Sequence, residues 1–211
     1  MKQAESRYGG IIIAMVLCVV WMAVTGVIGT FGLYESPRSE AHHSILITVL
    51  TPTTFFAILF LLVPSVRCWT QRLNLAMLAL PHAWRTVGFV FLTSWFFGVL
   101  PAGFAAPAGF GDFFIGIAAP FIAVALWLQW SGAIRAAVWF HILGIIDLFF
   151  ALLTGITGFG VPDEQMSMID PMSAYPLVII PTVFVPLLLV GHVMALTKIA
   201  MDKRSSQSAL V

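Results

Sequence analysis

Charged side chains are scarce in this sequence, and their scarcity excludes most classes of soluble protein. Only 9% of its 211 residues are Asp, Glu, Lys or Arg, whereas soluble domains average about 25%. Hydrophobic residues make up 60% of the chain, and its mean hydropathy is +1.01. The composition therefore predicts an integral membrane protein whose first partner is the lipid bilayer. No basic run favours nucleic acid as a partner.

Cysteine is almost absent, which excludes a disulfide framework and a cysteine-rich metal site. Cys18 lies in the first apolar run and Cys68 in a basic connection, so the two thiols are expected at different depths and unpaired. The sequence also lacks HExxH, GxSxG and P-loop motifs. Without a motif of known chemistry, an enzyme is the less favoured class, and no motif predicts a cofactor or a metal.

Long apolar runs are plentiful, and they predict an all-α integral membrane protein with six transmembrane helices. About 20 apolar residues span a bilayer, so a chain of this length leaves no room for a separate soluble domain. We expect one transmembrane domain over residues 1–200 and a disordered tail over 201–211. The six expected helices cover residues 10–33, 44–63, 86–100, 112–130, 133–157 and 175–199. The first is too long for a signal peptide and is expected to be retained.

Two segments contain enough proline and glycine to disturb a helix. Between Pro101 and Asp112 the tetrapeptide Pro-Ala-Gly-Phe occurs twice, and the glycines and prolines over 101–111 predict a broken backbone. The last helix carries three prolines at a spacing of five residues, which predict a kinked or locally unwound first half. Irregular backbone at membrane depth is tolerated only where protein covers it or water lines it.

The basic residues in the connections set the expected orientation, because cytoplasmic loops carry an excess of Lys and Arg. Placing both termini in the cytoplasm puts nine of the ten basic residues on that side and leaves only Arg38 outside. The expected location is therefore the cell (inner) membrane, with an acidic outer face. We also expect a homo-oligomer or a place in a larger membrane complex.

Two aspartates inside the expected helices are the main candidates for function. Asp147 lies in an apolar helix, where an ionisable side chain is costly and tends to face a cavity or a partner. Isolated there, its carboxyl would favour the protonated form, which suits a proton-coupled step. The alternative is a hydrogen-bonded carboxyl that locks two helices together. Asp112 follows a glycine where a helix is expected to begin, which favours a helix N-cap over a second cation site near the outer entrance.

Two histidines are expected at similar depths in the last two helices. His141 and His192 lie about 12 and 10.5 Å from the cytoplasmic ends of their helices, at 1.5 Å per residue. Consecutive antiparallel helices often pack, so the pair could ligate haem b or a metal. The alternative is that each histidine forms a hydrogen bond between helices.

Three further histidines lie near the expected membrane boundaries. His82 and Arg85 are three residues apart before a helix, so they share a face and are expected to anchor the interface or to contact a lipid phosphate or a substrate anion. On the outer loop, Glu40 with His42 and His43 is a weak candidate for a metal site.

Together these patterns favour a small permease or channel-like protein that moves a proton, a cation or a small solute past Asp147. The alternative is a membrane redox or enzyme subunit with a haem b, metal or quinone site at His141 and His192. A third reading is a non-catalytic accessory subunit whose polar groups serve packing.

Overall fold

The computed structural model describes residues 16–17, 19–35 and 38–208, without the side chains of 38–42 and 205–208. All regular elements in these residues are helical. Five of the described helices are long and apolar enough to span a membrane: His43–Leu62, Leu75–Phe96, Ala102–Trp127, Ala133–Thr157 and Ile180–Arg204. The shorter apolar helix Val19–Thr30 belongs to the first expected span. The all-α fold is confirmed, and the sixth span stays a prediction.

The outer faces of the long helices carry large apolar side chains. Phe96 is 83% exposed, Phe121 69% and Trp127 68%. Such surfaces are costly in water but are solvated by lipid chains. The helices therefore indicate a membrane-embedded protein.

Several sequence predictions concern parts of the chain that lie outside the described residues or side chains. They are those on Lys2 and Arg7, the start of the first helix, Cys18, the side chains of Arg38, Glu40 and His42, and residues 209–211.

The chain divides into two compact units, and the first comprises residues 1–72 and 171–187. Its helices are Val19–Thr30, α2 (Arg38–Leu62), α3 (Pro64–Arg72) and the π-helical η3 (Ile180–Phe184). Within this unit α2 packs against both α3 and η3. Trp21 donates its indole N–H to the Thr182 carbonyl at 3.1 Å, which ties the first helix to η3.

The last predicted helix is irregular where its prolines lie. η3 is π-helical and contains Pro181, and α8 (Val185–Ser208) follows it directly. Local unwinding was expected there, whereas the bend itself stays a prediction. The predicted disordered tail is wrong as far as Ser208, because α8 continues to that residue. Lys198 supports this continuation by pairing with Asp202 at 3.0 Å, one helical turn onward.

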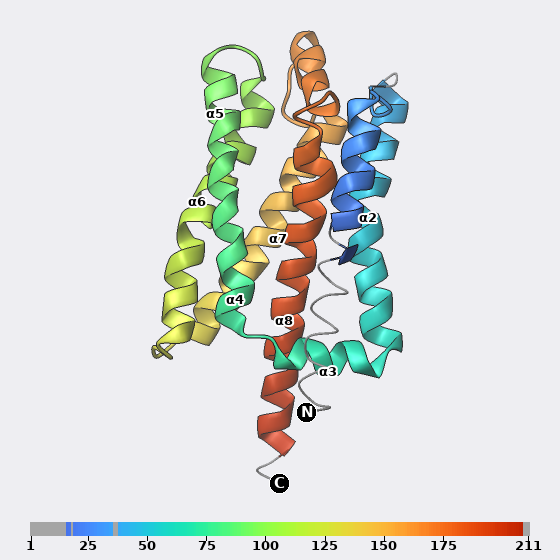
Figure 1. Cartoon of the computed structure of the whole chain (residues 1–211). Coiled ribbons are helices and arrows are strands. Elements are labelled where there is room, and N and C mark those ends of the chain that lie inside the picture. Colours follow the sequence, from blue (N-terminus) through green and yellow to red (C-terminus); the bar gives the residue numbers. More distant parts are fainter. Residues whose placement is uncertain (1–15, 18, 36–37, 209–211) are drawn as a thin grey trace. The chain divides into compact units, whose positions relative to one another are not determined.

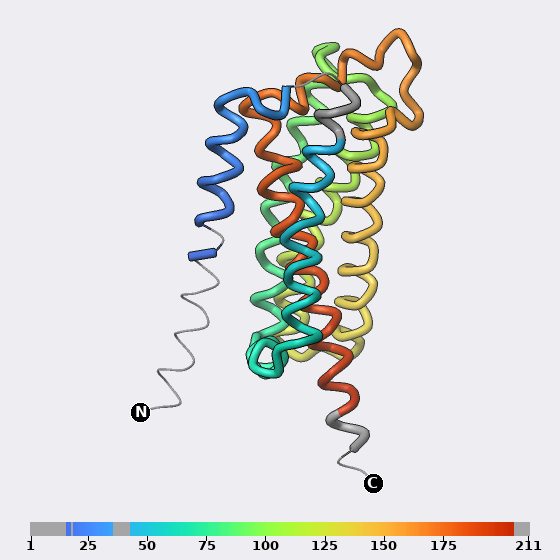
Figure 2. Tube along the Cα trace, turned by 90° about the vertical axis from the view of Figure 1, so that its right-hand side faces the viewer, coloured from blue at the N-terminus to red at the C-terminus, as the bar shows by residue number. Residues whose placement is uncertain are grey.

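The second unit comprises residues 73–170 and 188–211. Its helices are α4 (Leu75–Ala79), the 3-10 helix η1 (Leu80–Gly88), α5 (Phe89–Phe96), α6 (Ala102–Trp127), α7 (Ala133–Thr157) and the later part of α8; the 3-10 segment η2 (Asp163–Ser173) follows α7. α6 packs against α4, η1, α5 and α7, and Figure 1 shows it running beside α5 and α7. Both views show α8 running past the ends of α6 and α7 (Figure 2).

One span begins earlier than the sequence predicts. It runs from Leu75 to Phe96 through α4, η1 and α5, whereas the predicted helix covers 86–100. Asn74 starts the span because its side-chain Oδ1 accepts the N–H of Ala76 at 2.8 Å. Residues 75–85, which were expected before the helix, therefore belong to the span as α4 and part of η1. The functional candidates His82 and Arg85 lie in this added part.

The predicted break over 101–111 is wrong, because α6 is helical from Ala102 through Pro107 to Trp127. The glycines of this stretch allow close packing instead. A Cβ added at Gly103 would overlap the backbone of Gly160, and one at Gly109 would lie 2.6 Å from Leu92. Small residues let helix backbones approach closely in membranes, and this tertiary contact outweighs the low helix propensity of glycine.

α7 has the bounds that the sequence predicts, Ala133–Thr157. Gly132 precedes it with a φ of +84°, and Gly158 follows it with a φ of +69°. Glycine adopts this left-handed conformation without the penalty that a Cβ brings. Both ends of α7 are thus set by local sequence.

Candidate functional site

Arg85 lies inside the second unit and pairs with two carboxylates. Its side chain is fully buried. Its Nε donates to Oδ1 of Asp112 at 2.7 Å, and its Nη2 donates to Oδ2 of Asp147. Its Nη1 donates to the carbonyl oxygen of Gly144 at 3.2 Å. One guanidinium therefore joins η1, α6 and α7.

Glycines bring these three elements close enough for the ion pairs. A Cβ added at Gly88 in η1 would lie 2.9 Å from Oδ2 of Asp112, and one at Gly111 in α6 would overlap the carboxylate of Asp147. A larger residue at either position would push a carboxylate away from Arg85. The glycine-rich start of α6 therefore serves the site directly.

Three histidines lie beside these ion pairs, and all of them are buried. His82 is 1% exposed, and His141 and His192 are 0% exposed. They come from η1, α7 and α8. The rings of His82 and His192 stack with centroids 3.7 Å apart, and the ring of His141 meets that of His192 edge-on at 5.1 Å. The Nδ1 atoms of His141 and His192 are 2.8 Å apart, a hydrogen-bond distance.

Some of these ring nitrogens lack partners. Among the described residues, neither nitrogen of His82 has a hydrogen-bond partner, and the same holds for Nε2 of His141. A buried polar atom without a partner costs about 1–3 kcal/mol. When one nitrogen is taken from each ring, the three nitrogens all lie within 4.8 Å of one another, so these residues could hold a metal ion.

The histidines and the ion pairs form one group. Nη1 of Arg85 is 3.4 Å from Nε2 of His192. A guanidinium only donates, so Nε2 of His192 must accept in this contact. We call the following six residues the buried polar cluster: His82, Arg85, Asp112, His141, Asp147 and His192. Its histidines and arginine are buried, whereas the two aspartate side chains are 15% and 18% exposed. With both carboxylates ionised and the histidines neutral, the cluster carries one formal negative charge.

The structure corrects two of the aspartate predictions. Asp112 is not a helix N-cap, because α6 begins at Ala102 with Pro101 in the N-cap position. Asp147 is not isolated, because it pairs with Arg85. The alternative expectation for Asp147, a carboxyl that locks helices together through a partner, agrees with this pairing.

The boundary histidines also differ from expectation. His82 and Arg85 were expected to face a lipid phosphate or a substrate anion, whereas both are buried within the span Leu75–Phe96. His43 is exposed, and the side chains of Glu40 and His42, its expected partners for a metal, are outside the described part of the chain.

The contact between His141 and His192 confirms that their helices bring them together. A haem iron lies between its two axial nitrogens at about 2 Å from each, so a haem would need these rings to separate from 2.8 Å to about 4 Å. A single metal ion bound at one edge of the rings needs a smaller movement. Both the haem and the metal expectation for this pair stay predictions.

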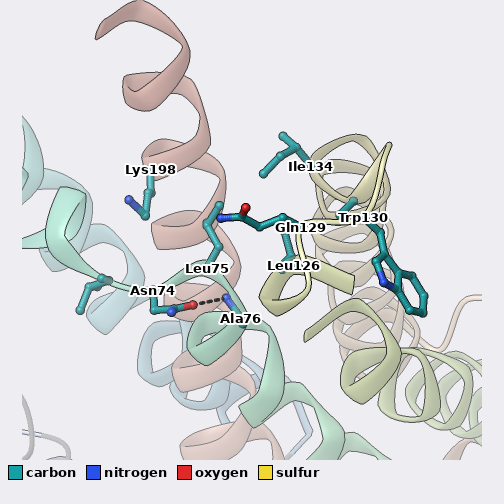
Figure 3. A pocket seen from close by; sticks show the side chains of 10 residues that line it. Asn74, Leu75, Ala76, Leu126, Gln129, Trp130, Ile134 and Lys198 are labelled. Carbon is teal, nitrogen blue, oxygen red and sulfur yellow. Dashed lines mark hydrogen bonds between the residues drawn. The ribbon is translucent and has the colours of Figure 1, made fainter. Parts of the chain in front are cut away.

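A pocket of about 460 Å³ opens at one end of the second unit (Figure 3). Leu75, Leu126 and Ile134 give it apolar walls, and Asn74, Gln129 and Lys198 add polar groups. None of the residues that line it belongs to the buried polar cluster. Lys198 lies six residues after His192, about 9 Å along α8 at 1.5 Å per residue.

The sequence missed the shared role of Arg85 and the contact of His82 with the other histidines. Both omissions follow from placing residues 73–85 in a connection. The signal was present, because Leu73, Leu75, Leu78 and Leu80 extend the apolar run toward the N-terminus. Starting the span at residue 75 would have placed Arg85 at membrane depth, where an arginine needs a carboxylate partner.

The fold and the cluster define a class: helical membrane-embedded proteins with ionisable residues buried inside the bundle. Within this class, the chain belongs to the family DUF8737, a domain of unknown function, whose profile matches residues 42–200. The matched region contains the whole buried polar cluster. No curated protein and no solved structure matches the chain.

Proposed function

We propose that the protein is a small permease or channel-like protein that moves a cation across the cell membrane through the buried polar cluster. The observation that carries this proposal is the pairing of one buried arginine, Arg85, with both Asp112 and Asp147. Ionisable side chains inside membrane spans are costly and typically mark ion pathways or proton relays. The excess negative charge of the cluster favours a cation or a proton over an anion.

Arg85 supports a competition mechanism. A cation that reaches Asp112 or Asp147 competes with the guanidinium for the carboxylate oxygens. The guanidinium keeps its bond to the Gly144 carbonyl meanwhile, and it cannot lose its own proton. When Arg85 returns to the carboxylate, the cation is released. Arg85 thus acts as an internal cation that shortens the stay of the transported one.

The pocket supplies one route into the unit. In our proposal the pocket and the histidines are separated by a core layer, which reaches from Ala76 in the pocket lining to Phe140 beside the histidines and comprises Ala76, Ala79, Ala119, Ala123 and Phe140. The ring of Phe140 lies 5.8 Å from that of His82 and 4.9 Å from that of His141. In our proposal, rotation of Phe140 connects the pocket to the cluster.

Flux into proteoliposomes tests the proposal. We expect the purified chain to conduct protons or a monovalent or divalent cation, and we expect Asp147→Asn and Asp112→Asn each to lower the flux at least about tenfold, since each removes a charge from the path. Asp163→Asn is the matched control, because Asp163 is exposed and lies outside the spans. Full flux in a folded Asp147→Asn protein would contradict the proposal.

The orientation is part of the same proposal, with both termini in the cytoplasm. Cys68 is an exposed thiol in α3, between two spans, and is expected on the cytoplasmic side. In a Cys18→Ser background, an impermeant maleimide should label Cys68 in inverted membrane vesicles but not in intact cells. Labelling in intact cells would reverse the topology.

A redox or enzyme subunit is the second candidate, favoured by the contact between His141 and His192. A Soret band in the purified protein, lost in His141→Ala, would support haem b and oppose the permease. If neither flux nor a cofactor is found, an accessory subunit is the better description. We also propose a homo-oligomer or a larger membrane complex, which native mass spectrometry of the extracted protein would test.

A further inference from the structure

The three histidines of the cluster form a set of nitrogen donors that nothing else in the cluster uses fully. His82, His141 and His192 come from three different helical elements and converge in a site that is closed to solvent. In the described part of the chain, three of their six ring nitrogens have no hydrogen-bond partner. A metal bound to His82 would give one of its two unpartnered nitrogens a partner, and a buried polar atom without a partner is costly.

The imidazole nitrogens determine which metal ions the site would favour. Neutral imidazole suits zinc, copper, iron and nickel, whereas magnesium and calcium prefer oxygen ligands. Three histidines with an open fourth position are a known arrangement for Zn²⁺. The negative charge left by Asp112 and Asp147 against Arg85 lowers the cost of placing a cation beside them.

The distances and the ring orientations set the adjustment that a metal ion would require. Zinc–nitrogen bonds of about 2.0–2.1 Å at a tetrahedral angle place two ligand nitrogens about 3.4 Å apart. The Nδ1 atoms of His141 and His192 are closer than this, at 2.8 Å, and the full set of ligand nitrogens lies within 4.8 Å. The rings of His82 and His192 are stacked 20° from parallel, so they must also turn relative to each other before their lone pairs converge on one ion.

We propose that His82, His141 and His192 bind a divalent transition-metal ion of the zinc class, with the fourth coordination position open. The ion replaces the proton between the two Nδ1 atoms. His192 then carries its proton on Nε2, which faces Arg85, so metal binding breaks the contact between Arg85 and His192. Transport of such an ion rests on the proposed function. The binding site itself does not depend on that function.

Metal binding to the purified full-length chain tests the site. Metal-free protein in detergent is equilibrated with Zn²⁺, and bound zinc is measured by plasma mass spectrometry and titration calorimetry. We expect one zinc per chain. Each of His82→Gln, His141→Gln and His192→Gln should weaken binding by more than the 10–100-fold that loss of an outer-sphere partner typically costs. His43→Gln is the matched control, because His43 is exposed and lies in the first unit.

Co²⁺ provides a spectroscopic probe of the same site. Tetrahedral Co²⁺ with nitrogen ligands gives visible absorption bands, which Zn²⁺ should displace and which Mg²⁺ should leave unchanged. If the histidine variants fold poorly, thermal unfolding of the wild-type chain with and without Zn²⁺ still tests the proposal, because a bound ion stabilises the folded state. Absence of Zn²⁺ and Co²⁺ binding by the folded wild-type chain overturns the site, as does equal binding by the three histidine variants.

Flux measurements separate the two proposals. Zinc binding that depends on the three histidines, without flux of any cation, overturns the permease and keeps the metal site. Flux of protons or a monovalent cation that depends on Asp147, without zinc binding, overturns the metal site and keeps the permease. Zinc flux that is lost both in Asp147→Asn and in His141→Gln supports both.

Discussion

His141 and His192 face each other through their Nδ1 atoms at 2.8 Å, and this contact fixes the proton positions on both rings. Because Arg85 only donates, Nε2 of His192 accepts from it, and the proton of a neutral His192 sits on Nδ1. His192 therefore donates to Nδ1 of His141, whose own proton sits on Nε2. Without metal, the two rings are locked in opposite tautomers by a residue on η1.

This relationship predicts a nitrogen NMR pattern. In metal-free protein labelled with ¹⁵N-histidine, His192 should be the Nδ1–H tautomer and His141 the Nε2–H tautomer, with His43 serving as an exposed reference that exchanges rapidly. On addition of Zn²⁺, His192 should change to the Nε2–H form. Observation of an Nε2–H proton on His192 before metal is added would contradict the inferred hydrogen-bond direction.

Replacing Arg85 should destabilise the second unit. Arg85→Gln leaves the partly exposed Asp112 and Asp147 without their counter-ion, and breaking a buried ion pair costs at most about 3–5 kcal/mol. Unfolding of the detergent-solubilised protein measures the loss. Arg135→Gln is the control, because Arg135 is exposed, and it should change the free energy of unfolding by no more than about 0.5 kcal/mol. Equal stability of the two variants would argue against a structural role for the ion pairs.

Gly144 should tolerate no side chain, because a Cβ at this position would overlap the ring of His192. Gly144→Ala should cost about 1–3 kcal/mol through overpacking and should weaken zinc binding by moving His192. Gly26→Ala is the control, since a Cβ there would have no atom within 4 Å. That change should be neutral or slightly stabilising in the same unfolding measurement. A neutral Gly144→Ala would show that His192 is free to move.

Phe140 should control access to the histidines from the pocket. Phe140→Ala should destabilise the unit by about 3–5 kcal/mol and should open the layer between the pocket and the cluster. Exchange of bound Zn²⁺ for a chelator, followed in a stopped-flow instrument, should become faster. Trp139→Ala is the control, because this ring is 60% exposed on the adjacent helix surface. Equal exchange rates in both variants would exclude this route.

Local sequence was sufficient where helix ends depend on neighbouring residues. The bounds of α7 were predicted from its apolar run, and the structure has the same bounds, with a left-handed glycine next to each end. The stretch from Pro101 to Asp112 was misread for the opposite reason. Its glycines break an isolated helix, but here they let α6 contact Leu92 and Asp147 closely. Helix propensity describes an isolated helix, and in α6 the close packing of neighbouring helices outweighs the low propensity of its glycines.

The sequence by itself determined the class of this protein, because apolar length and scarce charge leave few alternatives to a bundle of membrane helices. It also singled out all six cluster positions: the two aspartates for transport, His141 and His192 as haem or metal ligands, and His82 with Arg85 as contacts at the interface. Only the tertiary structure decided which of them meet. Arg85 lies 27 residues from Asp112 and 62 from Asp147, and such separations are bridged by helix packing. Electrostatic pairing at membrane depth depends on distances that no local pattern encodes.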